Sequence, residues 1–173
     1  MSKTKENLKF AFSGESQARN KYTFFAEVAR KEGFEQIAAI FEETAANEKA
    51  HAERLFEFLK GIGDTKQNLK TAIEGEHYEW TQMYPTFEKE ARKEGLKEIA
   101  DALKEIAEVE EQHEKRYRKL LENLEEGKVF KKEKVVKWKC RNCGYIHEGK
   151  EPPEKCPACG YSKSYYELLC ENY

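Results

Sequence analysis

Polar and apolar positions up to about Glu126 repeat with the period of an α-helix. Apolar residues recur at alternating steps of four and three, as in a helix that turns one side toward a core. Lys-Glu-Gly ends two of these runs, at 31–33 and 93–95, and Gly-Ile-Gly-Asp follows another at 61–64. Because glycine commonly ends helices, the pattern predicts four helices of roughly 25 to 30 residues, with Asp64 placed to cap the third.

An internal repeat groups the four predicted helices into two pairs. The sequence ARKEG occurs at 29–33 and again at 91–95, an offset of 62 residues. A duplicated helical hairpin explains this repeat, and two hairpins make an antiparallel four-helix bundle. The same offset aligns further residues of one type: Ile37 with Ile99, Ala38 with Ala100, Glu48 with Glu110, His51 with His113 and Arg54 with Arg116.

Each predicted helix carries a glutamate in its apolar stripe. In the second helix, positions 37, 41, 44, 48, 51, 55 and 58 read Ile, Phe, Thr, Glu, His, Leu, Phe, and the fourth helix interrupts its stripe at the same places with Glu110 and His113. The first and third helices contribute Glu15 and Glu76. A buried, unpaired carboxylate costs several kcal/mol, so four in register need a shared reason.

Three interpretations of these glutamates compete. Any one of them alone is explained as a solvated surface residue, and a buried network held only by hydrogen bonds is a second alternative. The recurrence of Glu-x-x-His at the repeat offset favours a dinuclear metal centre, because a spacing of three places both side chains on one helical face. Two single carboxylates and two Glu-x-x-His pairs form the donor set known for carboxylate-bridged bundles. Such oxygen and imidazole ligands suit iron or manganese.

Composition excludes several classes of function. Of the 173 residues 37% are charged, and 31 basic against 33 acidic residues leave a net charge of −2. This balance gives no case for a nucleic-acid or anionic-membrane partner. No apolar run approaches the roughly 18 residues of a membrane span, and the first residues do not resemble a signal peptide. We therefore expect a soluble, cytoplasmic protein.

All cysteines lie in the last 34 residues, where the composition also changes. CRNCGY and CPACGY are two Cys-x-x-Cys knuckles, and together they predict a tetrahedral four-sulfur site for zinc or a single iron. Glycines and prolines replace the helical period beyond residues 127–137. We expect a helical domain at 1–130 and a small metal-binding module at 135–173. Cys170 is interpreted as a spare or buried thiol, and His147 as a turn residue.

Several motifs together resemble the rubrerythrin family along the whole chain: GES (14–16), NEKAHAE (47–53), GEHYEWTQMYP (75–85) and EVEEQHEKRY (108–117). The two knuckles resemble rubredoxin. The resemblance implies a mainly α fold, a ferritin-like di-iron four-helix bundle followed by a rubredoxin-like module with one iron. It implies Glu48 and Glu110 as bridging ligands. The implied ligands are Glu15, Glu48 and His51 for one iron, Glu76, Glu110 and His113 for the other, and Cys140, Cys143, Cys156 and Cys159 for the mononuclear iron.

The two halves of the repeat differ in the third helix. Aligning GES with GEH requires an offset of 61, so one extra residue lies between Glu76 and Ala91. An inserted residue in a helix often forms a π-bulge, and the sequence MYP at 83–85 is the expected place. The alternative is a kink at Pro85 without a π turn.

Glu79 aligns with Ala18, so only the second half has a carboxylate at this position. The resemblance implies that Glu79 binds one iron of the oxidised centre and yields it to His51 on reduction; the alternative is a surface glutamate beside Trp80. His77 is interpreted as a supporting or structural residue. Tyr22 and Tyr84 can hydrogen-bond ligands or bound peroxide, or simply pack.

The resemblance implies a peroxidase that reduces hydrogen peroxide to water in oxidative-stress defence of an anaerobe. Electrons would come from NAD(P)H through a separate reductase or a rubredoxin, and the four-cysteine iron would relay them. The chain has no Gly-rich dinucleotide fingerprint, so NAD(P)H itself is not expected to bind. A homodimer or higher homo-oligomer is expected, in which the module of one subunit serves the bundle of another. The rivals are an iron-oxidising or iron-storage protein and a zinc-ribbon docking domain.

Overall fold

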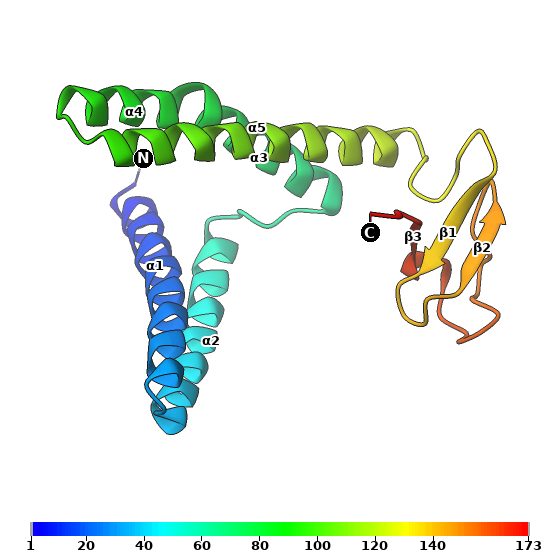
Figure 1. Cartoon of the computed structure of the whole chain (residues 1–173), viewed down its shortest axis with the longest axis horizontal. Helices are drawn as coiled ribbons and strands as arrows, with labels where there is room; N and C mark the ends of the chain where they lie inside the picture. The colour runs from blue at the N-terminus through cyan, green and yellow to red at the C-terminus, as the bar shows by residue number, and fades with distance from the viewer. Residues whose placement is uncertain (1, 173) are drawn as a thin grey trace. The chain divides into compact units, whose positions relative to one another are not determined.

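The computed structural model describes residues 2–172, which divide into two compact units, one ending at Asp64 and the other beginning at Thr65 (Figure 1). The first unit is an antiparallel pair of helices. The second contains another helical pair, followed by a small sheet. The predicted fold class is confirmed: the chain is mainly α-helical with a small C-terminal β module.

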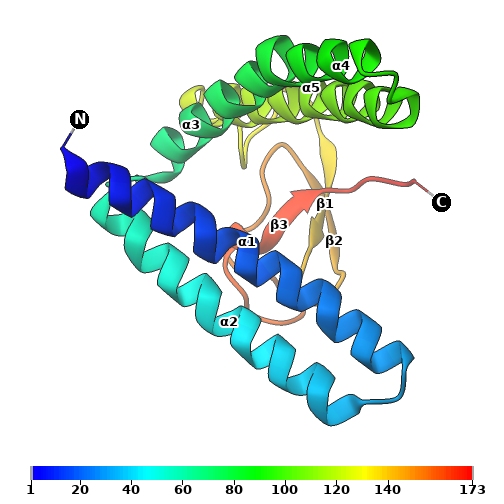
Figure 2. The same cartoon turned by 90° about the vertical axis from the view of Figure 1, so that its left-hand side faces the viewer.

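The first unit consists of α1 (Lys3–Lys31) and α2 (Glu35–Phe58), which lie side by side in both views (Figures 1 and 2). The Ser2 hydroxyl caps α1 by accepting a hydrogen bond from the Lys5 N–H. Gly33 has φ 85° in the turn between the helices, as its place in Lys-Glu-Gly predicts. After α2 it is Lys60, with φ 57°, that takes the left-handed conformation rather than Gly61.

Small residues pair the two helices of the first unit. Ala26 and Ala29 of α1 are buried, as are Ala38, Ala45 and Ala52 of α2. Alanines at a spacing of seven let the two backbones approach closely, because they form one stripe with little side-chain bulk. The predicted core stripe lies beside this one, so larger residues such as Ile37 and Phe58 remain exposed.

The second unit begins with one long helical segment that contains a π turn. It comprises α3 (Thr65–Tyr78), the π-helical turn η1 (Glu79–Met83) and α4 (Tyr84–Lys93), and it packs against α5 (Lys97–Glu125). The Tyr84 N–H donates to the Glu79 carbonyl, five residues back. The predicted π-bulge is therefore confirmed, although it ends before Pro85 instead of including it, and the alternative of a kink without a π turn is wrong.

The C-terminal module is a three-stranded antiparallel sheet in the order β2-β1-β3. Its strands are β1 (Val136–Cys140), β2 (Ile146–Gly149) and β3 (Tyr166–Leu168), and the short helix η2 (Lys163–Tyr165) precedes the last. Trp138 is buried at its centre and donates from its indole to the Gly149 carbonyl at 3.0 Å. His147 pairs with Trp138 across the sheet, so its assignment to a turn was wrong.

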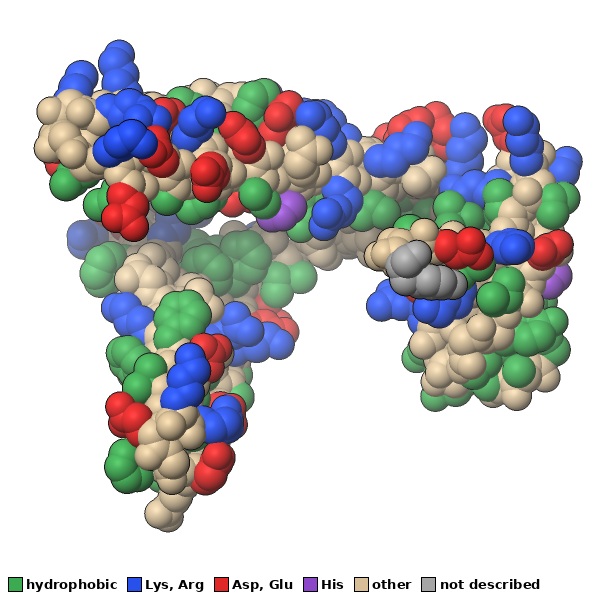
Figure 3. Space-filling model, viewed as in Figure 1, with side chains coloured by type: hydrophobic (Ala, Val, Ile, Leu, Met, Phe, Trp, Pro, Cys, Tyr) green, Lys and Arg blue, Asp and Glu red, His purple; other side chains and the backbone are tan. Residues whose placement is uncertain are grey.

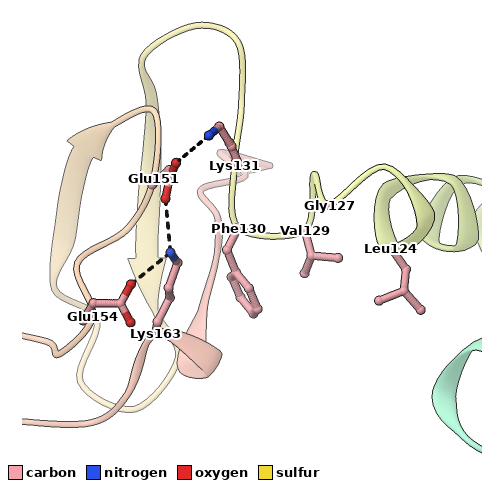
Figure 4. A pocket seen from close by; sticks show the side chains of 8 residues that line it. All are labelled: Leu124, Gly127, Val129, Phe130, Lys131, Glu151, Glu154 and Lys163. Carbon is pink, nitrogen blue, oxygen red and sulfur yellow. Dashed lines mark hydrogen bonds and ion pairs between the residues drawn. The ribbon is translucent and has the colours of Figure 1, made fainter.

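An ion pair joins the segment after α5 to the module, and further ion pairs lie next to it within the module (Figure 4). Lys131 pairs with Glu151 at 3.2 Å, and Lys163 reaches both Glu151 and Glu154 at 3.2 Å. These charged residues line a pocket together with Leu124, Val129 and Phe130. The connection is thus held to the module by Lys131, whose partner Glu151 is itself held by Lys163.

Charged side chains of both signs are intermixed over α4 and α5 (Figure 3). Within residues 2–172, none of the helices combines the length and the apolar character that crossing a bilayer requires.

Candidate metal centres

A first group of ligand atoms lies within the first helical pair. Glu15 comes from α1, and Glu48 and His51 come from one face of α2. Their nearest oxygen and nitrogen atoms all lie within 4.8 Å of one another. The Nδ1 atom of His51 is 2.9 Å from Oε2 of Glu48. We call these three residues the first half-site.

The two carboxyl groups of the first half-site share a hydrogen bond, which shifts their pKa values in opposite directions. It raises the pKa of Glu15, and burial and the charge of Glu48 add to this effect. The pKa of Glu48 is lowered, first by the hydrogen bond with His51 and then by that with Glu15. Two carboxyl groups this close favour a bound cation, because a cation removes the repulsion between their charges.

The second helical pair repeats this arrangement. Glu76 lies on α3, Glu110 and His113 lie on α5, and their ligand atoms again fall within 4.8 Å. The Nδ1 atom of His113 is 2.6 Å from Oε2 of Glu110 and 3.6 Å from Oε1 of Glu76. Burial raises the pKa of Glu76, and the charge of Glu110 raises it further. These three residues form the second half-site.

Two further residues lie near the second half-site without belonging to that close group. The pKa of Glu79, in η1, is raised by burial and by the charge of Glu110. The pKa of Tyr84 is raised by burial and by the charge of Glu79. Tyr22 in the first unit instead packs in an aromatic cluster, with its ring 6.2 Å from that of Phe41. The tyrosines of the two units therefore have different surroundings.

Sequence reasoning did not single out Glu114, although this residue joins α5 to the π turn. It accepts hydrogen bonds from the indole N–H of Trp80 and from the guanidinium of Arg118, and it lies 3.1 Å from Nδ1 of His77. The repeat could have indicated that Glu114 is buried, because the corresponding residue in the first half is Ala52, which is buried. The supporting role predicted for His77 remains a prediction, and this contact is consistent with it.

The four cysteines of the two knuckles converge on one point. The Sγ atoms of Cys140 and Cys159 are 3.8 Å apart, and those of Cys143 and Cys156 are 3.6 Å apart. Four sulfurs bonded to one metal at about 2.3 Å in a tetrahedron lie about 3.8 Å from each other, so the separations fit a metal site. They are far too long for disulfide bonds.

The two knuckles have the same backbone geometry. Gly144 and Gly160 have φ 80° and 75°, and each donates its N–H to the carbonyl of the first cysteine of its knuckle at 2.8 Å. Burial raises the pKa of the Cys156 thiol, but the Tyr166 hydroxyl and the N–H groups of Cys159 and Ala158 lower it to about 6. Backbone N–H groups also lower the pKa of Cys159, whereas hydrogen bonds with the other three cysteines raise that of Cys143, so the second knuckle favours thiolates, the form that binds metal.

Cys170 is exposed and lies outside this four-sulfur group. Of the two interpretations offered for it, a buried thiol is therefore wrong.

Family models match both parts of the chain. The rubrerythrin model matches residues 6–121, and the model of the rubrerythrin rubredoxin-like domain matches residues 138–167. Rubrerythrin-1 of Clostridium acetobutylicum is 52% identical, covering 99% of this chain and 96% of that protein. The rubrerythrins of Porphyromonas gingivalis and Nitratidesulfovibrio vulgaris are each 49% identical over 99% of this chain, and the matches cover 92% and 97% of those proteins.

The donor groups and these matches agree on the cofactors. Carboxylate and imidazole ligands in the helical part fit a di-iron centre, and the four cysteines fit one further iron. Sequence, geometry and relatives thus converge, and the chain belongs to the rubrerythrin family.

Proposed function

We propose that this rubrerythrin reduces hydrogen peroxide to two molecules of water, with two electrons and two protons. As a member of the family the chain is an oxidoreductase. The observation that carries the proposal is the presence in one chain of two Glu/His half-sites and a four-cysteine site. The two half-sites together can hold a metal centre for two-electron chemistry, and the four-cysteine site can hold an iron that relays single electrons.

We assign the iron ligands as the resemblance implies. Glu15, Glu48 and His51 serve one ion of the di-iron centre, and Glu76, Glu110 and His113 serve the other. By the same resemblance, Glu48 and Glu110 would be the bridging pair. Glu79 and His51 would be alternative ligands of one ion, since a carboxylate suits ferric iron and neutral imidazole suits ferrous iron.

A di-iron centre held by these residues would supply the two electrons for the reduction of peroxide. Around it, the protein controls protons and charge. Burial and the neighbouring carboxylates raise the pKa of Tyr84, so its hydroxyl stays protonated and could donate a hydrogen bond to peroxide. Tyr22 is the corresponding candidate in the first helical pair.

The electron donor is proposed to be a separate protein, either a rubredoxin or an NAD(P)H-dependent reductase. It would deliver single electrons to the four-cysteine iron. We further propose that the protein is a homodimer or a higher homo-oligomer. The helical domain at 1–130 and the module at 135–173 are the proposed functional division.

An anaerobic reoxidation experiment tests this function. The protein is fully reduced without oxygen, mixed with stoichiometric peroxide or with oxygen, and followed by visible absorption. We expect peroxide to reoxidise it much faster than oxygen does. Equal rates would favour the rival function of iron oxidation and storage.

Metal analysis tests the electron relay separately. We expect three irons per chain and a red, reducible chromophore from the four-cysteine site. One zinc and two irons would remove the relay and favour a docking role for the module.

A further inference from the structure

Glu114 is the charged side chain most withdrawn from solvent among residues 2–172, with 5% of its surface exposed. One of its carboxylate oxygens, Oε2, accepts from the indole N–H of Trp80 and lies 3.1 Å from Nδ1 of His77. The other, Oε1, accepts from Nε of Arg118 at 2.6 Å and forms an ion pair with a terminal nitrogen of the same guanidinium at 2.5 Å. Both oxygens are thus satisfied, as a buried carboxylate requires.

These contacts tie together three places in the second unit that adjoin the proposed iron ligands. Glu114 directly follows His113 in α5, His77 directly follows Glu76, and Trp80 directly follows Glu79. Neighbouring residues of a helix point about 100° apart, so the Glu114 contacts lie beside the ligand face and not on it. Glu114 is also absent from the group of mutually close ligand atoms.

The first half of the repeat lacks this arrangement and also lacks the π turn. Ala52 stands at the position of Glu114, and Ser16 and Arg19 stand at those of His77 and Trp80. Helix α1 runs without interruption over the corresponding residues. The buried charge and the π turn therefore occur together, in the half that carries Glu79.

A buried carboxylate in place of an alanine is not a device for stability. Replacing buried ion pairs by well-packed apolar residues is often neutral or stabilising, and the first unit shows that alanine suffices to pair such helices. Glu114 instead orients the side chains that it contacts, because hydrogen bonds fix the orientation of the groups they join, whereas apolar contacts do so less strictly.

We propose that Glu114 is a positioning residue of the second half-site: through Trp80 and His77 it fastens η1 to α5 and so fixes where Glu79 and Glu76 stand relative to Glu110 and His113. This inference rests on the proposed iron ligation. Glu114 itself does not bind the metal. It acts through the backbone of the two residues it holds.

The test combines local hydrogen exchange with spectroscopy on the iron-loaded protein. In Glu114→Ala, we expect amide exchange in the 76–84 segment to accelerate about tenfold or more, because the turn loses its anchor to α5. We expect the diferric absorption bands to change and peroxide turnover to fall about 10- to 100-fold, as for other residues that orient metal ligands. Exchange in α1 and the spectrum of the four-sulfur iron should stay unchanged.

Glu111→Ala is the matched control. Glu111 lies on the same helix and pairs with the exposed Lys115 four residues on, as Glu114 does with Arg118. It should alter neither the exchange of 76–84 nor the diferric spectrum. Trp80→Phe keeps an aromatic ring but removes the indole donor, and it should show the same local changes with smaller amplitude. This variant decides the question if Glu114→Ala fails to fold.

Two outcomes would overturn the positioning role. One is unchanged exchange in the 76–84 segment in both variants. The other is faster exchange with an unaltered diferric spectrum, which would reduce Glu114 to a packing residue. A wild-type protein that does not react with peroxide would refute the proposed function instead, and the exchange and spectral results would still test Glu114.

Discussion

The two helical pairs of this chain descend from one pattern but are held together by different means. The first pair closes on alanines and on the stacked rings of Phe12 and Phe56, whose centroids are 4.8 Å apart. Where Phe12 and Phe56 stand, the second pair has Ile73 and Arg118, and Arg118 joins the Glu114 network. We call the alanines and the two stacked rings the apolar frame of the first pair, whereas the second pair combines a π turn with a buried charge.

Some features of the proposed metal centre occur in both halves, and others occur in only one half. Both bring two carboxylates and a histidine within 4.8 Å, so the donor set belongs to the repeat itself. Glu79 and the π turn belong only to the second half. Any asymmetry in the chemistry of the two irons should therefore originate there.

The largest effects are expected from the shared ligands. Glu48→Ala and Glu110→Ala each remove a proposed bridge, so both should reduce iron from three to about one per chain and lower peroxide turnover about 100-fold or more. Iron analysis and visible spectra measure this, and the four-sulfur iron serves as the internal standard. The exposed Glu43→Ala in α2 is the control. Retention of three irons by either variant would contradict the bridging assignment.

Glu79→Ala tests the asymmetry directly. We expect peroxide turnover to fall about 10- to 100-fold while iron content stays unchanged, because six ligands remain. Adding Ala18→Glu should not restore activity, since Ala18 lies in the regular α1 and not in a π turn. Stopped-flow absorption measures the rates, with Glu74→Ala on the solvent side of α3 as control. Full turnover in Glu79→Ala would remove the switching role.

Gly61→Ala tests the apolar frame of the first pair. A Cβ atom there would lie 2.1 Å from a ring carbon of Phe56, so the ring must leave its stack on Phe12. We expect a loss of about 1–2 kcal/mol and a melting temperature lower by about 2–6 °C, measured by calorimetry. Gly14→Ala, with no atom within 4 Å, should not destabilise the protein. An unchanged melting temperature in Gly61→Ala would show that the stack is dispensable.

The smallest effect concerns acid stability at the turn of the second pair. Lys97 and then Arg92 lower the pKa of Asp101 by hydrogen bonding. A carboxyl group whose pKa is lower in the folded state stabilises the fold above its unfolded pKa of about 3.9, and the contribution is lost as pH falls through the folded value. The difference in melting temperature between wild type and Asp101→Asn should therefore shrink below about pH 4. Equal differences at neutral and acid pH would contradict this.

Local sequence determined much of this protein because its information is periodic. Steps of three and four residues define the helices, and a spacing of three places Glu48 beside His51 and Glu110 beside His113. Even the π turn could be predicted from the sequence. The repeat offset is 61 residues at Glu76 and 62 at Ala91, so the third predicted helix must accommodate one extra residue between them. The position of the π turn was predicted a few residues too late, because Pro85 suggested the break and the turn formed on its N-terminal side.

Only the tertiary structure decided which side chains meet across helices. The alanine stripe at 38, 45 and 52 pairs α2 with α1, although the larger residues next to it gave the stronger apolar signal, because close helix packing selects small side chains. Glu114 looked like one more surface glutamate in a chain with 33 acidic residues. Besides the local contact with Arg118, it contacts Trp80 and His77, which lie more than 30 positions away, and no local pattern encodes such contacts.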